Sequence, residues 1–140
     1  MKKVVVTGIS TGIGYAIVKI LLREGYFVFG SVRKEKDAER LSLEFKRNFV
    51  PLIFDVTDLD SIIENAKIVK QNLTLNESLF GLVNNAGIAL GGPISMIKTD
   101  VFRKQFDVNF FGLIDVTKTF LPLLGGYKNS INQGKIINIS

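Results

Sequence analysis

The sequence predicts an α/β fold, a doubly wound parallel sheet in a single domain covering residues 1–140. Short β-branched runs alternate along the chain with segments of helical periodicity, a pattern typical of parallel strands with helices on both faces. Hydrophobic residues make up 46% and charged residues 22%, which indicates a globular chain with a core. No linker, repeat or low-complexity tract divides the chain.

Each expected element has a local signal. Runs of β-branched or aromatic residues predict strands at residues 3–7, 27–32, 50–55, 80–83 and 135–139. Apolar residues at helical spacing predict helices at residues 12–23, 36–47, 58–72 and 100–124. Gly25 is expected to end the first helix, and Asp58 to cap the third.

The sharpest local signal is the glycine-rich turn at residues 7–14, between the first strand and the first helix. Gly8 permits a tight turn out of the strand, Gly12 lets the backbone approach a pyrophosphate, and Gly14 lets the helix lie close to the sheet. The start of the helix then offers oriented N–H groups and partial positive charge to phosphates. This context favours a dinucleotide-binding turn over a plain one.

The spacing Gly-x-x-x-Gly-x-Gly resembles that of the short-chain dehydrogenase/reductase family, and four further motifs resemble the family in the same order. They are Asp55-Val56, Asn84-Asn85-Ala86-Gly87, Asn109 within Val-Asn-Phe-Phe-Gly, and the run Ile-Ile-Asn-Ile-Ser at residues 136–140. The resemblance implies a Rossmann-like fold and a nicotinamide-dependent oxidoreductase. Such an enzyme moves hydride between its cofactor and a small-molecule carbonyl or alcohol.

The resemblance also implies a cofactor site. Its predicted residues are Gly8, Ser10, Thr11, Gly12, Ile13, Gly14, Arg33, Asp55, Val56, Asn85, Ala86 and Gly87. The glycines and the Ile13 backbone would hold the pyrophosphate, while Asp55 and Val56 would contact adenine. The Asn85-Ala86-Gly87 segment would line the cleft, with Thr7 as its partner on the first strand. Asp55 has a second interpretation, in which the segment Asp-Val-Thr-Asp at residues 55–58 simply ends a strand and caps a helix.

One position bears on cofactor choice. Val32 ends the second strand, where an acidic residue would bind both ribose hydroxyls and repel a 2′-phosphate, and Arg33 follows it. An arginine there can pair with the 2′-phosphate, and Ser10 and Thr11 can add hydroxyl contacts. NADP(H) is therefore the preferred cofactor and NAD(H) remains possible. The alternative is that Arg33 is a surface charge.

Asn109 matches the one member of the family's catalytic tetrad that the chain contains, on a helix that is locally distorted in the family. The other interpretation is a core-facing amide among Phe102, Phe106 and Phe110, which are spaced four apart and predicted to be core. A buried amide without a partner costs about 1–3 kcal/mol, so Asn109 should have one.

The family's catalytic serine, tyrosine and lysine are expected beyond the chain end. Ser140 matches the residue before the catalytic serine. Tyr15 and Lys19 have the Tyr-x-x-x-Lys spacing but lie on the first helix, where the pair is not expected to be catalytic. The chain is thus expected to be an N-terminal, truncated part without activity of its own. The alternatives are a non-catalytic dinucleotide-binding module and an inactive fragment.

The composition of the chain excludes or disfavours several kinds of site and binding partner. Cysteine and histidine are absent, which excludes disulfides and thiolate sites, and no metal is predicted. The net charge of +5 includes a basic patch at residues 33–47 that also holds acidic residues, so a solvated helix is favoured over nucleic-acid binding. No apolar run approaches the roughly 20 residues of a membrane span, and a cytoplasmic protein is expected. Exposed apolar faces on the open sheet and on the helix at 100–124 predict homo-oligomers.

Overall fold

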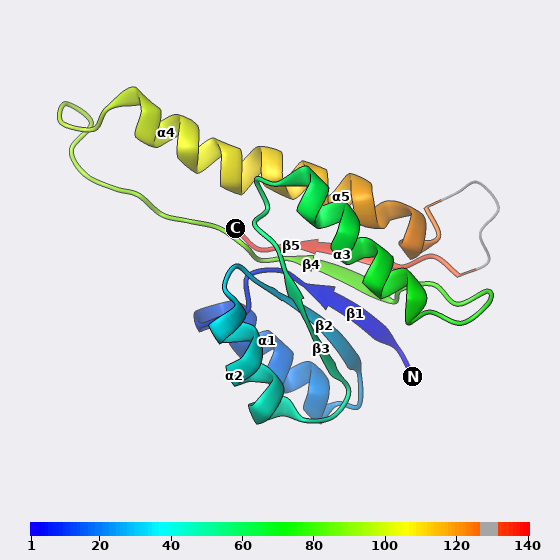
Figure 1. Cartoon of the computed structure of the whole chain (residues 1–140). Helices are drawn as coiled ribbons and strands as arrows, with labels where there is room; N and C mark the ends of the chain where they lie inside the picture. Colours follow the sequence, from blue (N-terminus) through cyan, green and yellow to red (C-terminus); the bar gives the residue numbers. More distant parts are fainter. Residues whose placement is uncertain (127–131) are drawn as a thin grey trace.

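The computed structural model describes residues 1–126 and 132–140 (Figure 1). Its five parallel strands lie in the order β3-β2-β1-β4-β5, which confirms the predicted fold class. The strands are β1 (Lys3–Val6), β2 (Phe27–Val32), β3 (Phe49–Ile53), β4 (Gly81–Asn84) and β5 (Lys135–Asn138). The chain order reverses between β1 and β4, so a crevice is expected outside the carboxyl ends of these two strands.

Side chains of β1 alternate between the two faces of the sheet, and each face has its own core. Val5 packs on one face beneath α3 (Leu59–Gln71) and α5 (Leu113–Phe120). Val4 and Val6 pack on the other face against α1 (Gly12–Arg23) and α2 (Glu35–Phe45). Figure 1 shows these two helix layers on opposite sides of the sheet. A nearly continuous run of valines fits a strand that is buried on both faces.

The ends of the helices follow the expected local chemistry. Asp58 caps α3 by accepting a hydrogen bond from the Ser61 N–H at 3.1 Å, which confirms the predicted cap. Gly25, at φ +79°, follows α1 in the left-handed conformation that favours glycine.

The predicted helix at residues 100–124 is continuous but not uniform. It consists of α4 (Thr99–Phe106), the π-helical turns η1 (Asp107–Gly112), α5, and a closing 3₁₀ turn η2 (Leu121–Leu124). The π-helical turns confirm the expected local distortion and contain Asn109. Gly125, at φ +71°, ends the helix.

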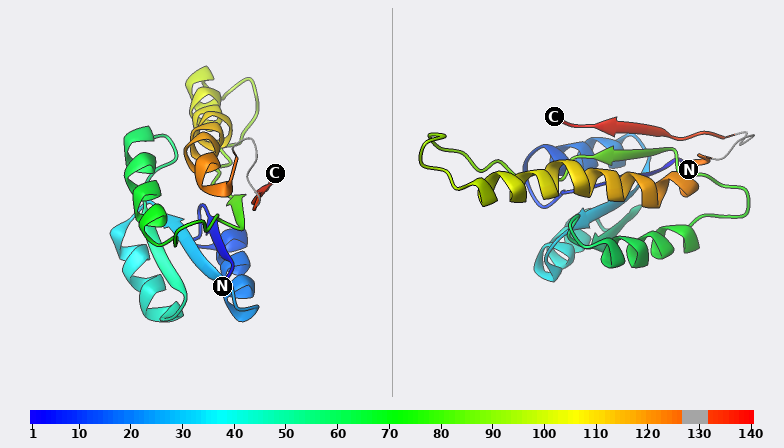
Figure 2. Two further views of the ribbon diagram at one scale, coloured as in Figure 1. Left: turned by 90° about the vertical axis from the view of Figure 1, so that its right-hand side faces the viewer. Right: turned by 90° about the horizontal axis from the view of Figure 1, so that it is seen from above.

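The aromatic residues of this helix do not lie where the sequence placed them. Phe106 and Phe110 are 60% and 51% exposed, so the prediction that they belong to the core is wrong. Val116 and Phe120 of α5 fill the core instead. A four-residue spacing identifies one face of a helix but not what that face contacts. Figure 2 shows that α4 extends past the carboxyl ends of the strands, where no sheet lies beneath it.

The two edges of the sheet differ. Asn48 O and Phe54 N both bond to β2, so the alternate residues Phe49, Pro51 and Ile53 direct their backbone groups outward. Pro51 has no N–H to offer, and Asn65 of α3 binds both the N–H and the C=O of Ile53, at 3.0 and 2.9 Å. At the other edge, all four residues of β5 are exposed, as expected for an open sheet.

Across residues 1–126 and 132–140, no helix combines the length and the apolar character needed to cross a lipid bilayer.

Candidate functional site

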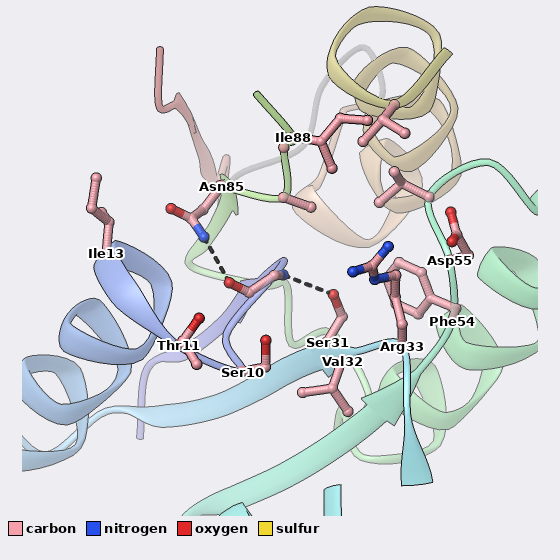
Figure 3. A pocket seen from close by; sticks show the side chains of 15 residues that line it. Ser10, Thr11, Ile13, Ser31, Val32, Arg33, Phe54, Asp55, Asn85 and Ile88 are labelled. Atoms are coloured by element: carbon pink, nitrogen blue, oxygen red, sulfur yellow. Dashed lines mark hydrogen bonds between the residues drawn. The ribbon is translucent and has the colours of Figure 1, made fainter. Parts of the chain in front are cut away.

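A pocket of about 360 Å³ lies at the carboxyl ends of β1, β2 and β4, in the expected crevice (Figure 3). It joins segments that are far apart in the sequence: the turn after β1, the end of β2, the residues after β3 and the residues after β4. Its lining residues are Gly8, Ser10, Thr11, Ile13, Ser31, Val32, Arg33, Phe54, Asp55, Val56, Asn85, Ala86, Gly87, Ile88 and Val108.

All predicted cofactor residues except Gly12 and Gly14 line this pocket. Arg33 projects from the end of β2 into it, and the hydroxyls of Ser10 and Thr11 lie on the side of the glycine turn (Figure 3). The arrangement brings a cation, two hydroxyls and a backbone turn around one hollow. This combination suits a phosphorylated ligand.

Each of the three glycines in the turn is required for a different structural reason. Gly8 has φ +69°, and a Cβ there would lie 2.7 Å from the Cα of Ala86. A Cβ on Gly14 would collide with the Asn85 side chain and the Gly8 carbonyl. Gly12 has φ +63° with open space around it, so its backbone is accessible to a ligand.

Thr7 joins the glycine turn to the segment after β4. Its Oγ1 accepts hydrogen bonds from the N–H groups of Asn85, at 3.0 Å, and Ala86, at 2.9 Å. The Asn85 amide donates in return to the carbonyls of Thr7, at 3.0 Å, and Gly8, at 2.9 Å. These bonds confirm Thr7 as the partner predicted for this segment, and they fix both walls of the pocket.

The start of α1 lacks the usual side-chain cap. Thr11 occupies the N-cap position without a side-chain hydrogen bond, and the first turn holds no acidic residue. By contrast, Asp58 caps α3, and Glu35 and Asp37 lie in the first turn of α2. The first N–H groups of α1 therefore have no side-chain acceptor in the described part of the chain, and an anion in the pocket would supply one.

Asp55 has a structural role as well as a place in the pocket. Its Oδ1 accepts from the Thr57 N–H at 2.9 Å and from the Thr57 hydroxyl at 2.7 Å. Partial burial raises the pKa of Asp55, but these hydrogen bonds and the charges of Arg33 and Lys104 outweigh it, so the pKa lies below its usual value. The carboxyl group is therefore ionised near neutral pH, and its Oδ2 accepts no hydrogen bond from residues 1–126 or 132–140.

Asn109 holds the backbone of Ile88. Its Nδ2 donates to the Ile88 carbonyl, and its Oδ1 accepts from the Ile88 N–H, both at 2.8 Å. The expectation that this amide has a partner is confirmed, although Asn109 is exposed rather than core-facing. A Cβ on Gly87 would lie 3.3 Å from Asn109 Oδ1, so the small residue permits this close approach.

Tyr15 has an environment opposite to that of an acid/base tyrosine. Its hydroxyl donates to Glu44 of α2, and this hydrogen bond to a carboxylate raises its pKa above the ordinary value. Lys19 lies over the ring, 5.5 Å from its centroid. A proton-transfer tyrosine needs a lowered pKa, so the geometry supports a structural role for this pair.

The sequence interpretation missed several pocket residues. Ser31, 2% exposed, accepts a hydrogen bond from the Gly8 N–H at 3.1 Å. A lone serine in an otherwise apolar strand was the available signal. Phe54, Ile88 and Val108 supply apolar walls and carry no local signal. Within residues 1–126 and 132–140, no cluster of three or more Asp, Glu, His or Cys residues is placed to hold a metal ion.

Comparisons with known proteins identify the family and the fold. The family described as short chain dehydrogenase matches residues 2–140. An NADPH-dependent 3-dehydrocapnine reductase of Ornithobacterium rhinotracheale is 40% identical over all of this chain and 49% of its own length. Retinol dehydrogenase 16 of Mus musculus is 36% identical over 99% of this chain and 42% of its own length. The crystal structure of serine dehydrogenase from Escherichia coli superposes with a TM-score of 0.86 at 29% identity, covering 99% of this chain and 61% of that one.

The sheet order and the glycine turn at its crevice define a Rossmann-like, doubly wound domain. The chain belongs to the short-chain dehydrogenase family, whose members bind NAD(P). It spans about half the length of the curated relatives that it matches.

Proposed function

We propose that this chain is a single NADP(H)-binding domain of an oxidoreductase that transfers hydride between the cofactor and a small carbonyl or alcohol. One observation carries the proposal: the pocket joins an uncapped helix start, the glycine turn and Arg33 around one hollow. Bound nicotinamide would supply the hydride acceptor or donor. The domain's own task is to hold and orient the dinucleotide.

The residues present fit a dinucleotide along the whole pocket. The N–H groups at the start of α1 and the accessible backbone of Gly12 suit the pyrophosphate. Asp55 and Val56 border the opposite end of the pocket, where an ionised carboxylate suits an amino group of adenine. Asn85 and Gly87 line the same pocket, and we expect a ribose beside them.

Arg33 supports the preference for NADP(H) over NAD(H). Its guanidinium has no carboxylate within ion-pair distance among the described residues, although its charge lowers the pKa of Asp55, so it can pair with a 2′-phosphate in the pocket. Ser10 and Thr11 line the same pocket and can add hydroxyl donors. The NADPH-dependent reductase among the relatives is consistent with this choice.

We propose that Asn109 acts as a positioning residue for the active site. By fixing the Ile88 peptide, it holds the loop that follows the Asn85-Ala86-Gly87 segment. In the parent enzyme it would also order a water for proton transfer, together with serine, tyrosine and lysine residues outside this chain. We therefore expect residues 1–140 alone to bind cofactor without turning over substrate.

Titration with NADP⁺ and NAD⁺ tests the proposal. The wild-type protein should bind NADP⁺ more tightly, and Arg33→Asp should weaken NADP⁺ binding roughly 10- to 100-fold, the value of a charge-assisted hydrogen bond, and should favour NAD⁺. Arg23→Asp, on the exposed end of α1, is the matched control and should change neither affinity. Tighter binding of NAD⁺ by the wild type would overturn the cofactor preference, and binding of neither would overturn the dinucleotide site.

A further inference from the structure

A polar contact joins α2 to the glycine turn across thirty residues of sequence. Arg40 Nη2 donates a hydrogen bond to the backbone carbonyl of Ser10 at 2.6 Å. Ser10 lines the pocket, whereas Arg40 does not. The contact of Arg40 with the pocket is therefore through the backbone that it holds.

The guanidinium of Arg40 is held in place from several sides. Asp37 lies 3.5 Å away one turn before it on α2, and Glu44 lies 3.9 Å away one turn after it. Glu44 also accepts the hydroxyl of Tyr15, which ties the network to α1. The Arg40 side chain is 46% exposed, so these ion pairs contribute little to stability and serve mainly to orient the guanidinium.

Holding a carbonyl also sets the direction of the following N–H. The peptide bond is planar and trans, so the Thr11 N–H points opposite to the Ser10 carbonyl, away from Arg40. Without the arginine, the Ser10–Thr11 peptide would be free to rotate and to present its carbonyl oxygen to the 2′-phosphate. That oxygen would repel the phosphate rather than bind it.

The position of α2 gives this contact a consequence for specificity. The helix begins at Glu35, two residues after Arg33, and reaches back through Arg40 to Ser10. One helix thus connects the two sides of the hollow in which the 2′-phosphate is expected, with Arg33 on one side and the turn hydroxyls on the other (Figure 3). Movement of the turn relative to α2 would widen that gap.

We propose that Arg40 is a positioning residue that holds the glycine turn at the correct distance from Arg33 and thereby sets the preference for NADP(H) over NAD(H). This inference rests on the proposed function, because it concerns the same pocket. A dinucleotide without the 2′-phosphate does not use the gap between Arg33 and the turn hydroxyls. Its affinity should therefore depend much less on Arg40.

The test compares NADP⁺ and NAD⁺ affinities of the wild-type protein, Arg40→Met, Arg40→Lys and the control Arg23→Met. We expect Arg40→Met to weaken NADP⁺ binding about tenfold and NAD⁺ binding less than about threefold, the loss of one oriented contact. Arg40→Lys, which keeps a donor and the charge, should recover most of the NADP⁺ affinity. Arg23 pairs only with its exposed neighbour Glu24, so Arg23→Met should match the wild type.

A second measurement needs no cofactor. In Arg40→Met, amide hydrogen exchange at residues 9–14 should be faster than in the wild type, with an unchanged Tm. Equal weakening of both dinucleotides, no weakening, or unchanged exchange in the turn would each overturn the role of Arg40. Wild-type protein that binds neither dinucleotide would overturn the proposed function itself, and with it the inference.

Discussion

Replacing Thr7 with valine removes the acceptor that the N–H groups of Asn85 and Ala86 share. Valine has nearly the same shape, so the 1% exposed site keeps its packing and loses only the hydroxyl. An unsatisfied N–H costs about 1–3 kcal/mol, and because both residues are partly exposed we expect a total of about 2–4 kcal/mol. At about 3–4 °C per kcal/mol for a chain of this size, Tm should fall by roughly 6–16 °C.

Urea unfolding followed by circular dichroism, together with thermal unfolding, measures this loss. Thr7→Ser keeps the hydroxyl and should retain most of the stability. Thr119→Val is the matched control, because the Thr119 hydroxyl only donates to the Asp115 carbonyl of its own helix. A change below about 0.5 kcal/mol in Thr7→Val, the range of an ordinary surface substitution, would refute the reasoning.

Three further outcomes are expected. Lys3 donates to Glu77 at 2.7 Å and, as the largest cause, lowers the pKa of Glu77. The stability from this pair is therefore present above the ordinary glutamate pKa and lost as the pH falls through the lowered one. The difference between wild type and Lys3→Met in urea unfolding should therefore shrink as the pH falls from about 6 to 3, leaving the part contributed by the Lys3 hydrogen bond to the Asn72 carbonyl. Asn65→Leu should lower the free energy of unfolding by about 2–3 kcal/mol in the same assay, because the N–H and C=O of Ile53 lose their hydrogen-bond partner. An unchanged free energy of unfolding would show that water replaces the amide. If copies associate through the exposed helix at 100–124, Phe110→Ser should lower the sedimentation mass, and an unchanged mass would exclude this face.

Local signals predicted most of the fold. The first helix and the second strand occupy the residues expected for them, because the glycines before and after the first helix leave little freedom in its ends. The third helix begins after Asp58 because its carboxylate is an effective cap. The long helix was predicted as one element, and only the family resemblance, not its periodicity, indicated the distortion at Asn109.

The missed features depend on contacts between distant residues. Ser31 meets Gly8 across 23 positions, and Arg40 meets Ser10 across 30, so neither contact leaves a local pattern. The exposure of Phe106 and Phe110 was missed for a related reason. Periodicity describes one helix, whereas burial depends on where the neighbouring sheet ends.

The two edge strands, β3 and β5, differ in whether a further strand can pair with them. At the β3 edge, Pro51 has no N–H, and Asn65 already bonds the N–H and C=O of Ile53. These two features prevent a further strand from pairing with β3. The N–H groups of Lys135 and Ile139 donate hydrogen bonds toward β4. The N–H groups of alternate residues, such as Ile136, therefore point outward and are available to a further strand. Extension of the sheet, by the same polypeptide or by another molecule, therefore proceeds from one flank only. Any agent meant to limit fibre-like aggregation of this domain would need to cover that flank alone.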